Sequence, residues 1–239
     1  MKQIYIIRKH HPRLLLFFAG WGADETPFKA YRPEQCDFMI CYDYRTLDFD
    51  SSDLKEYQEI NVIGWSMGVW AASQTMPRLS LPIANRIAIN GTTYPIDEQK
   101  GIPPAIFRGT LDGLTGASLH KFLRRMCADS AAFKAFLEVT PRRPLEELKE
   151  ELAAIGKRIA NLNTADTNLN TTDTDLNLVN PKERFHWQQA VVGGNDRIIP
   201  PANQLQAWKE CGTPVHQTAD AHYQEELFHH YLQELWTNI

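Results

Sequence analysis

The sequence predicts an α/β protein built on a mostly parallel β-sheet with helices on both faces. Two observations support this fold class. Short apolar segments with strand character alternate with helical segments along most of the chain, which is typical of parallel sheets. The 239 residues are 43% hydrophobic and 23% charged, a composition ordinary for one globular unit with a sizeable buried core.

The individual elements follow from local patterns. The segment after Arg13 is wholly apolar, as in a strand buried on both faces, and a polar turn at His11 and Pro12 separates it from the segment before it. A helix is expected over 69–75, where Pro77 ends it. The predicted strands cover residues 3–7, 13–19, 38–42, 60–63, 83–90, 190–192 and 215–218.

Between residues 118 and 160 the sequence becomes continuously helical. Leu119, Phe122, Leu123 and Met126 have the spacing of one helix face. Helices inserted between two groups of strands are expected to form a lid over an active site, with extra core helices as the alternative. We therefore predict a core domain from residues 1–117 and 181–239, a helical lid at 118–160, and a flexible Asn- and Thr-rich loop at 161–180.

Composition argues against several classes of function. The net charge of -4 disfavours a general nucleic-acid binder. The four cysteines are scattered without a C-x-x-C pair, which favours free thiols over a zinc site or disulfides. The apolar runs near the N-terminus are too short for a signal peptide or a membrane span. We expect a cytoplasmic monomer that needs no membrane, metal or cofactor.

One motif carries the strongest chemical signal. Gly64-Trp65-Ser66-Met67-Gly68 matches G-x-S-x-G, follows an apolar strand and opens a helix. A sharp turn between strand and helix lifts the serine hydroxyl clear of the sheet, and the two glycines relieve crowding there. The motif in this context predicts an α/β-hydrolase fold with Ser66 as the nucleophile; a serine in an ordinary glycine-rich turn is the alternative.

Acyl transfer also needs two N–H donors for the negative charge that develops on the carbonyl oxygen. One is expected from Met67, directly after the nucleophile. The other is expected from Trp21, because Gly20 and Gly22 allow the loop after the strand at 13–19 to approach closely.

The base and the acid follow from chain order. His222 is the histidine that falls between the last predicted strand and the closing helix, at the sheet edge where Ser66 also lies. Asp196 follows the strand at 190–192 and precedes His222, which makes it the favoured acid. Asp97 and Asp220 remain rivals for that role.

With these residues assigned, the chain resembles the BioG-type pimeloyl-[acyl-carrier protein] methyl ester esterases of biotin synthesis. The resemblance rests on "FFAGWGAD", "NVIGWSMGVWAA", "AINGTTYPIDEQKGIPPAIFRGTL" and "DAHY" and covers most of the chain except the Asn/Thr tract. It implies an α/β-hydrolase fold, a serine triad, and hydrolysis of the methyl ester of pimeloyl-acyl carrier protein to pimeloyl-ACP and methanol.

The expected partner, acyl carrier protein, is strongly acidic. Despite the negative total charge, the lid region carries basic residues that would steer such a partner, although a solvated helix face is an equally good interpretation. A thioesterase or acyltransferase on the same triad, or a non-catalytic module that binds acyl carrier protein, are the alternative functions. The predicted contact residues are Lys121, Arg124, Arg125, Arg142 and Arg143.

Overall fold

A computed structural model describes residues 1–165 and 185–236. Over these residues the chain forms a seven-stranded sheet of order β1-β3-β2-β4-β5-β6-β7. Edge strand β1 is antiparallel to β3, and the other neighbours are parallel. The strands are β1 Lys2–Ile7, β2 Arg13–Phe18, β3 Cys36–Tyr42, β4 Glu59–Trp65, β5 Ile83–Ile89, β6 Gln189–Gly193 and β7 Val215–Thr218. Each lies within about two residues of its predicted position.

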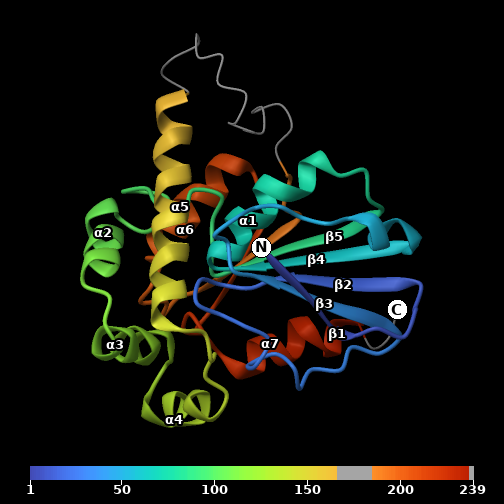
Figure 1. Ribbon diagram of the computed structural model, residues 1–239, viewed down its shortest axis with the longest axis horizontal. Coiled ribbons are helices and arrows are strands. Elements are labelled where there is room, and N and C mark those ends of the chain that lie inside the picture. The colour runs from blue at the N-terminus through green and yellow to red at the C-terminus, as the bar shows by residue number, and fades with distance from the viewer. Residues whose placement is uncertain (166–184, 237–239) are drawn as a thin grey trace.

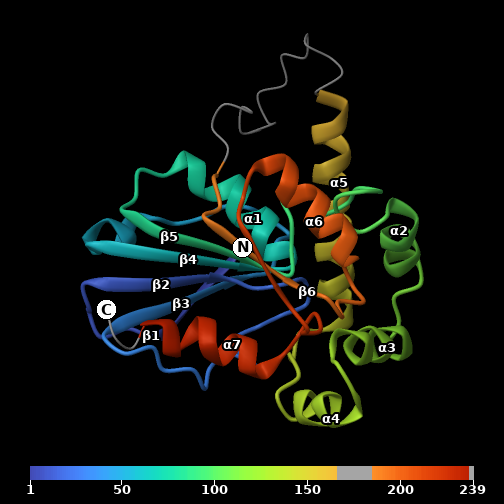
Figure 2. The ribbon, with the colours of Figure 1, turned by 180° about the vertical axis from the view of Figure 1, so that it is seen from behind.

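Helices cover both faces of this sheet, and others gather at one end of it. Helix α7 lies on one face, and α1 and α6 lie on the other (Figures 1 and 2). Helices α2 to α5 stand together beyond the carboxyl ends of the parallel strands (Figure 1). The helices are α1 Met67–Thr75, α2 Pro104–Asp112, α3 Gly116–Met126, α4 Ser130–Glu138, α5 Leu145–Ala165, α6 Pro201–Cys211 and α7 Glu225–Leu232.

The central strands are apolar because the sheet is covered on both faces. Residues 14–18 of β2 and 60–65 of β4 are buried throughout, so neither strand shows the alternating pattern of a sheet with one solvated face. Phe228 of α7 packs edge-on against Phe17, Phe28 and Trp65. The turn at residues 11–12 separates β1 from β2 in sequence, yet β3 lies between them in the sheet.

The helical region is longer than the sequence pattern predicted. It begins at Pro104 instead of residue 118. Pro104 is compatible with a helix start, because the N–H that proline lacks would have no partner in the first turn of α2. The predicted loop at 161–180 was wrong at its start: α5 continues to Ala165. Extending an existing helix costs far less than nucleating one, so the amphipathic turns before it carry the helix past the change in composition. Residues 166–180 lie outside the described residues.

Candidate active site

Ser66 lies at the junction of β4 and α1 in a strained backbone conformation. Its φ of 57° and ψ of -124° fall in a region that residues with a side chain rarely adopt. A hydrogen bond of 3.0 Å from Ser66 N to the Ile89 carbonyl of β5 helps to hold this turn. The conformation ends the strand abruptly and turns the hydroxyl away from the sheet, as the G-x-S-x-G motif predicted.

Glycines around Ser66 allow backbone segments to approach one another. A Cβ on Gly68 would overlap the carbonyl oxygen of Phe18 in β2, and one on Gly91 would overlap the carbonyl oxygen of Ser66 itself. At Gly64 an added Cβ would press on the backbone of Val69. The glycines of this region are therefore required for the close packing of β2, β4 and α1 around the serine.

His222 lies in the loop between β7 and α7, and two side chains hold its backbone. Trp65 Nε1 donates to the His222 carbonyl at 3.0 Å. Asn90, at the end of β5, donates through Nδ2 to the carbonyls of Ala221 and His222 at 3.0 and 3.1 Å, while its Oδ1 accepts from Gly193 N at 2.7 Å. Asn90 thus joins the ends of β5 and β6 to the histidine loop.

Ser66, His222 and Asp196 form one chain of hydrogen bonds. His222 Nε2 lies 3.0 Å from Ser66 Oγ, and His222 Nδ1 lies 2.8 Å from Asp196 Oδ2. All three residues are buried, with Ser66 6% exposed and His222 1% exposed. If Nδ1 carries the proton, Nε2 is free to accept the proton of the serine hydroxyl, which is the arrangement that nucleophilic catalysis requires.

The Asp196 carboxylate is held by donors on both oxygens. Oδ1 accepts from the backbone N–H groups of Ile198 and Ile199 at 2.7 and 3.0 Å, and Oδ2 accepts from Gln204 Nε2 at 2.8 Å. The orientation toward His222 is therefore fixed.

Neither rival carboxylate has a hydrogen bond to His222. Asp97 Oδ1 accepts from the N–H groups of Gln99 and Lys100 within its own turn. The carbonyl of Asp220 accepts from Asn195 N at 3.0 Å, which joins the loop carrying the histidine to the loop carrying Asp196.

The loop of residues 19–24, here called the oxyanion loop after its predicted role, lies beside Ser66. A Cβ on Gly20 would lie 3.1 Å from Ser66 Cβ, so a side chain there would crowd the nucleophile. Trp21 and Met67 both line the pocket that contains Ser66 and His222. The indole of Trp21 is buried, and its Nε1 donates to the Leu148 carbonyl of α5 at 2.9 Å. The Trp21 side chain is therefore a structural anchor, which leaves its backbone N–H for the predicted role.

The pocket over Ser66 lies between the oxyanion loop and helices α2, α3 and α5. Its walls are mainly apolar, as an acyl chain requires. Arg125 of α3 and Arg197, in the loop after β6, add positive charge to this lining, and both are exposed. Arg197 was not predicted as part of the site, although it directly follows Asp196. The apolar side chains are those of Ile102, Ile106, Phe107, Phe122, Met126 and Leu152.

The buried cysteines are poor alternatives to Ser66 as a nucleophile. Burial raises the pKa of Cys36 and of Cys127 to about 11, and it raises the pKa of Cys41 as well. Because the thiolate is the reactive form, these thiols stay protonated and unreactive near neutral pH.

Four of the five predicted partner-binding residues remain accessible at least in part. Lys121, Arg125 and Arg142 are exposed, and Arg124 is partly exposed beside Phe133. Arg143 was predicted wrongly as a surface contact: its side chain is only 4% exposed and pairs with Asp43 and Glu151. The adjacent arginines differ because the chain enters α5 here, so Arg143 turns inward against the end of β3 while Arg142 stays outside.

Comparison with solved structures identifies the class of fold. A bromoperoxidase from Bacillus anthracis superimposes with a TM-score of 0.60 at 12% identity, over 92% of this chain and 87% of that one. Together with the strained serine turn and the parallel sheet, this likeness assigns the chain to the α/β-hydrolase fold. Within the described residues, no helix is both long and apolar enough to cross a membrane.

The family is shown by a closer match. The family model "Pimeloyl-ACP methyl esterase BioG" matches residues 1–234, and the chain belongs to this family. The crystal structure of BioG from Haemophilus influenzae superimposes with a TM-score of 0.79 at 36% identity, covering 97% of this chain and 98% of that one.

A second relative is much longer than this chain. A protein of Bacteroides fragilis named malonyl-[acyl-carrier protein] O-methyltransferase is 51% identical over 213 residues. The match covers 89% of this chain but only 40% of that protein.

Proposed function

We propose that this protein is a serine esterase that hydrolyses the methyl ester of pimeloyl-acyl carrier protein, giving pimeloyl-ACP and methanol in biotin synthesis. The observation that carries the proposal is the buried chain of hydrogen bonds from Asp196 through His222 to Ser66. Hydrogen bonds of 2.8 and 3.0 Å are within the range needed for proton transfer from a hydroxyl to an imidazole that a carboxylate orients.

In the first half of the reaction, His222 Nε2 takes the proton of Ser66 as Oγ attacks the ester carbonyl. The negative charge that forms on the carbonyl oxygen is held by the N–H groups of Met67 and Trp21. The tetrahedral intermediate then collapses. The bond to the methoxy group breaks, and His222 returns its proton to the departing methanol.

In the second half, water hydrolyses the acyl-serine ester. His222 removes a proton from the water as its oxygen attacks the same carbonyl, and Ser66 leaves with that proton. The Asp196 carboxylate stabilises the imidazolium in both halves without taking the proton. The chemistry balances with water as the only co-reactant and requires no metal or cofactor.

Three observations support a methyl ester on acyl carrier protein as the substrate. The family description names this activity. The pocket lining is apolar enough for an acyl chain, and Arg125 and Arg197 offer positive charge to the acidic carrier. The Bacteroides relative is named for O-methylation of an acyl group on this carrier, a reaction that forms such an ester. We further propose that the protein acts as a monomer in the cytoplasm.

The direct test is methanol release from methyl pimeloyl-ACP by the purified protein, with mass spectrometry of the acyl carrier product. Ser66→Ala is expected to lower kcat by about 10⁵-fold or more, because it removes the nucleophile. Ser80→Ala, at an exposed position before β5, is the matched control and should behave as the unsubstituted protein. Turnover of the ester that survives in Ser66→Ala would refute the mechanism.

The same assay separates the alternative functions. A thioesterase would release free monomethyl pimelate and leave the carrier without its acyl group. A non-catalytic module would bind the carrier without turnover, and a fluorophosphonate probe would fail to label Ser66. Either result would replace the esterase proposal.

A further inference from the structure

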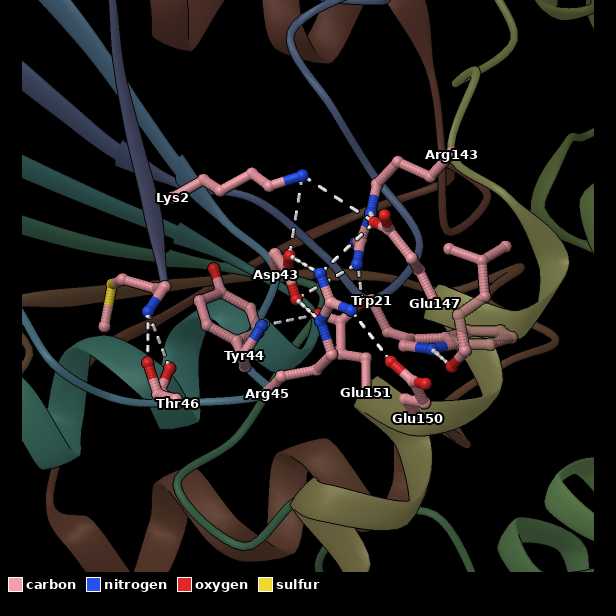
Figure 3. Close-up of polar contacts among 12 residues, drawn as sticks. Lys2, Trp21, Asp43, Tyr44, Arg45, Thr46, Arg143, Glu147, Glu150 and Glu151 are labelled. Atoms are coloured by element: carbon pink, nitrogen blue, oxygen red, sulfur yellow. Dashed lines mark hydrogen bonds and ion pairs between the residues drawn. The ribbon is translucent and has the colours of Figure 1, made fainter.

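A cluster of buried charges lies where the lid helix α5 meets the end of β3. This buried ion cluster consists of Asp43, Arg143 and Glu151, and the partly exposed Arg45 and Glu147 pair with it at its edge (Figure 3). Arg143 Nη1 donates to Glu151 Oε2 at 2.6 Å, and Arg143 Nη2 lies 3.1 Å from Asp43 Oδ1. Glu151 has no exposed surface.

Buried ion pairs are costly to form, so stability alone does not explain the cluster. Removing charges from water costs several kcal/mol per ion, and apolar replacements are often as stable. Charged hydrogen bonds, however, fix the direction of the groups that they join. These bonds therefore orient the backbone segments that they join.

The contacts of the cluster lead to the oxyanion loop. Glu151 Oε1 accepts from Tyr44 N at 2.9 Å (Figure 3). The Tyr44 hydroxyl donates to the Ala19 carbonyl at 2.7 Å. Arg143 Nη1 also reaches the Ala23 carbonyl at 3.4 Å. Ala19 at the start of the oxyanion loop and Ala23 near its end are thus both connected to the ion pair of Arg143 and Glu151.

Two further bonds join the oxyanion loop to the lid. Trp21 Nε1 donates to the Leu148 carbonyl, one turn of α5 from Glu151 (Figure 3). Arg142 N donates to Asp24 Oδ2 at 2.7 Å. The loop is therefore anchored at residues 19, 21, 23 and 24, while Gly20 and Gly22 between them have no side chain to restrain them.

We infer that Tyr44, Arg143 and Glu151 are positioning residues that hold the Trp21 N–H in place to stabilise the oxyanion. The inference rests on the proposed function. A donor aimed at developing charge is useful only if it is already in position when the charge forms. Residues that fix the loop are then expected to affect the transition state more than substrate binding, so kcat changes and KM does not.

Tyr44→Phe tests this with minimal change, because it removes only the hydroxyl, which lies 2.7 Å from the Ala19 carbonyl and 3.1 Å from the Cys41 carbonyl. With a small methyl ester as substrate, kcat is expected to fall by about tenfold, less than the 10²–10³-fold typical of losing an oxyanion donor outright. KM should change by less than about twofold. Glu151→Gln keeps an oxygen for Tyr44 N but turns an NH₂ group toward the Arg143 guanidinium, so the bond to Arg143 is lost and the same split between kcat and KM is expected.

Tyr57→Phe is the matched control. Like the Tyr44 hydroxyl, the Tyr57 hydroxyl is buried and donates a hydrogen bond. Its acceptor is Asp37 Oδ2, at 2.8 Å, and it lies at the end of the sheet opposite to Ser66. The variant should lose thermal stability and keep its kcat. If Tyr44→Phe kept the kcat of the unsubstituted protein, or raised KM at constant kcat, the inference would be overturned while the esterase function stood.

A measurement independent of turnover distinguishes the two failures. Amide hydrogen exchange at Gly20, Trp21 and Gly22 is expected to quicken in Tyr44→Phe and to stay unchanged in Tyr57→Phe. An unsubstituted protein without esterase activity would refute the function. Unchanged exchange at these three amides in Tyr44→Phe would refute the positioning role.

Discussion

At the scale of single residues, the site depends on Ser66, His222 and Asp196, whose polar side-chain atoms all have hydrogen-bond partners. Asp196 is the clearest case, because Oδ1 accepts two backbone N–H groups and Oδ2 faces both Gln204 and His222. An amide in this place has no good orientation. Its oxygen must take the position of Oδ1, which puts the NH₂ group against His222 Nδ1.

Asp196→Asn is therefore expected to lower kcat by about 10³–10⁴-fold. The amide would donate to His222 Nδ1, which places the imidazole proton on Nε2. A protonated Nε2 can no longer accept the proton of Ser66. Esterase assays across pH are the measurement, and Asp220→Asn is the control that should keep full activity. A severe loss in Asp220→Asn with little loss in Asp196→Asn would transfer the role of the acid to Asp220.

At the scale of elements, a buried carboxylate organises the connection between β1 and β2. Asp37 of β3 accepts from the N–H groups of Lys9, His10 and His11 in that connection and from the Tyr57 hydroxyl. Burial alone would raise the pKa of the Asp37 carboxyl, but these hydrogen bonds outweigh burial and lower the pKa. Asp37 thereby holds in place the loop that carries the chain from the edge strand to the centre of the sheet.

Asp37→Asn is expected to reduce the free energy of unfolding by about 1.5–3 kcal/mol at pH 7, because three N–H groups lose a charged acceptor. Since the folded pKa lies below the unfolded value, the stabilisation by Asp37 is complete above the unfolded pKa. It is lost as pH falls through the folded pKa. Urea titrations should show that the difference in free energy of unfolding between the unsubstituted protein and Asp37→Asn becomes smaller as the pH falls from 7 to about 3. Asp112→Asn, exposed at the end of α2, should follow the unsubstituted protein; a gap that widened in acid would contradict this account.

At the scale of the whole molecule, the insertion α2–α5 covers the carboxyl end of the sheet and leaves Ser66 within a pocket. The long helix α5 is part of this cover and is also fixed to β3 by the buried ion cluster. Lys121 of α3 and Arg142, between α4 and α5, are exposed and do not line the pocket. They are therefore available to a large acidic partner but not to a small ester.

The double variant Lys121→Glu with Arg142→Glu is expected to lower kcat/KM for methyl pimeloyl-ACP by about tenfold at low salt. Hydrolysis of a small methyl ester should be unchanged. Added salt should narrow the difference between the two proteins, because it screens exposed charges. Lys55→Glu, in the 3-10 helix Ser52–Glu56 at the far end of the sheet, is the control. If kcat/KM fell equally for both substrates, the substitutions would act on the active site and not on docking of the carrier protein.

The sequence by itself determined the strands, the α/β class and the turn at Ser66. These features depend on local sequence. Short continuous apolar segments predict buried strands, and the glycines at positions 64 and 68 permit the sharp turn at Ser66. Chain order also placed His222 in the loop between the last strand and the last helix. Its hydrogen bond to Ser66 nevertheless joins residues 156 positions apart.

Only the tertiary structure decided which carboxylate meets His222 and which arginine is buried. Three aspartates lie in loops that precede His222 in the chain: Asp97, Asp196 and Asp220. The packing of the strands and loops brings Asp196 into contact with His222. Arg142 and Arg143 are neighbours with the same chemistry, yet Arg143 binds Asp43, one hundred residues away, and Arg142 faces solvent. Such contacts arise when elements distant in sequence pack together, and no local pattern of residues encodes them.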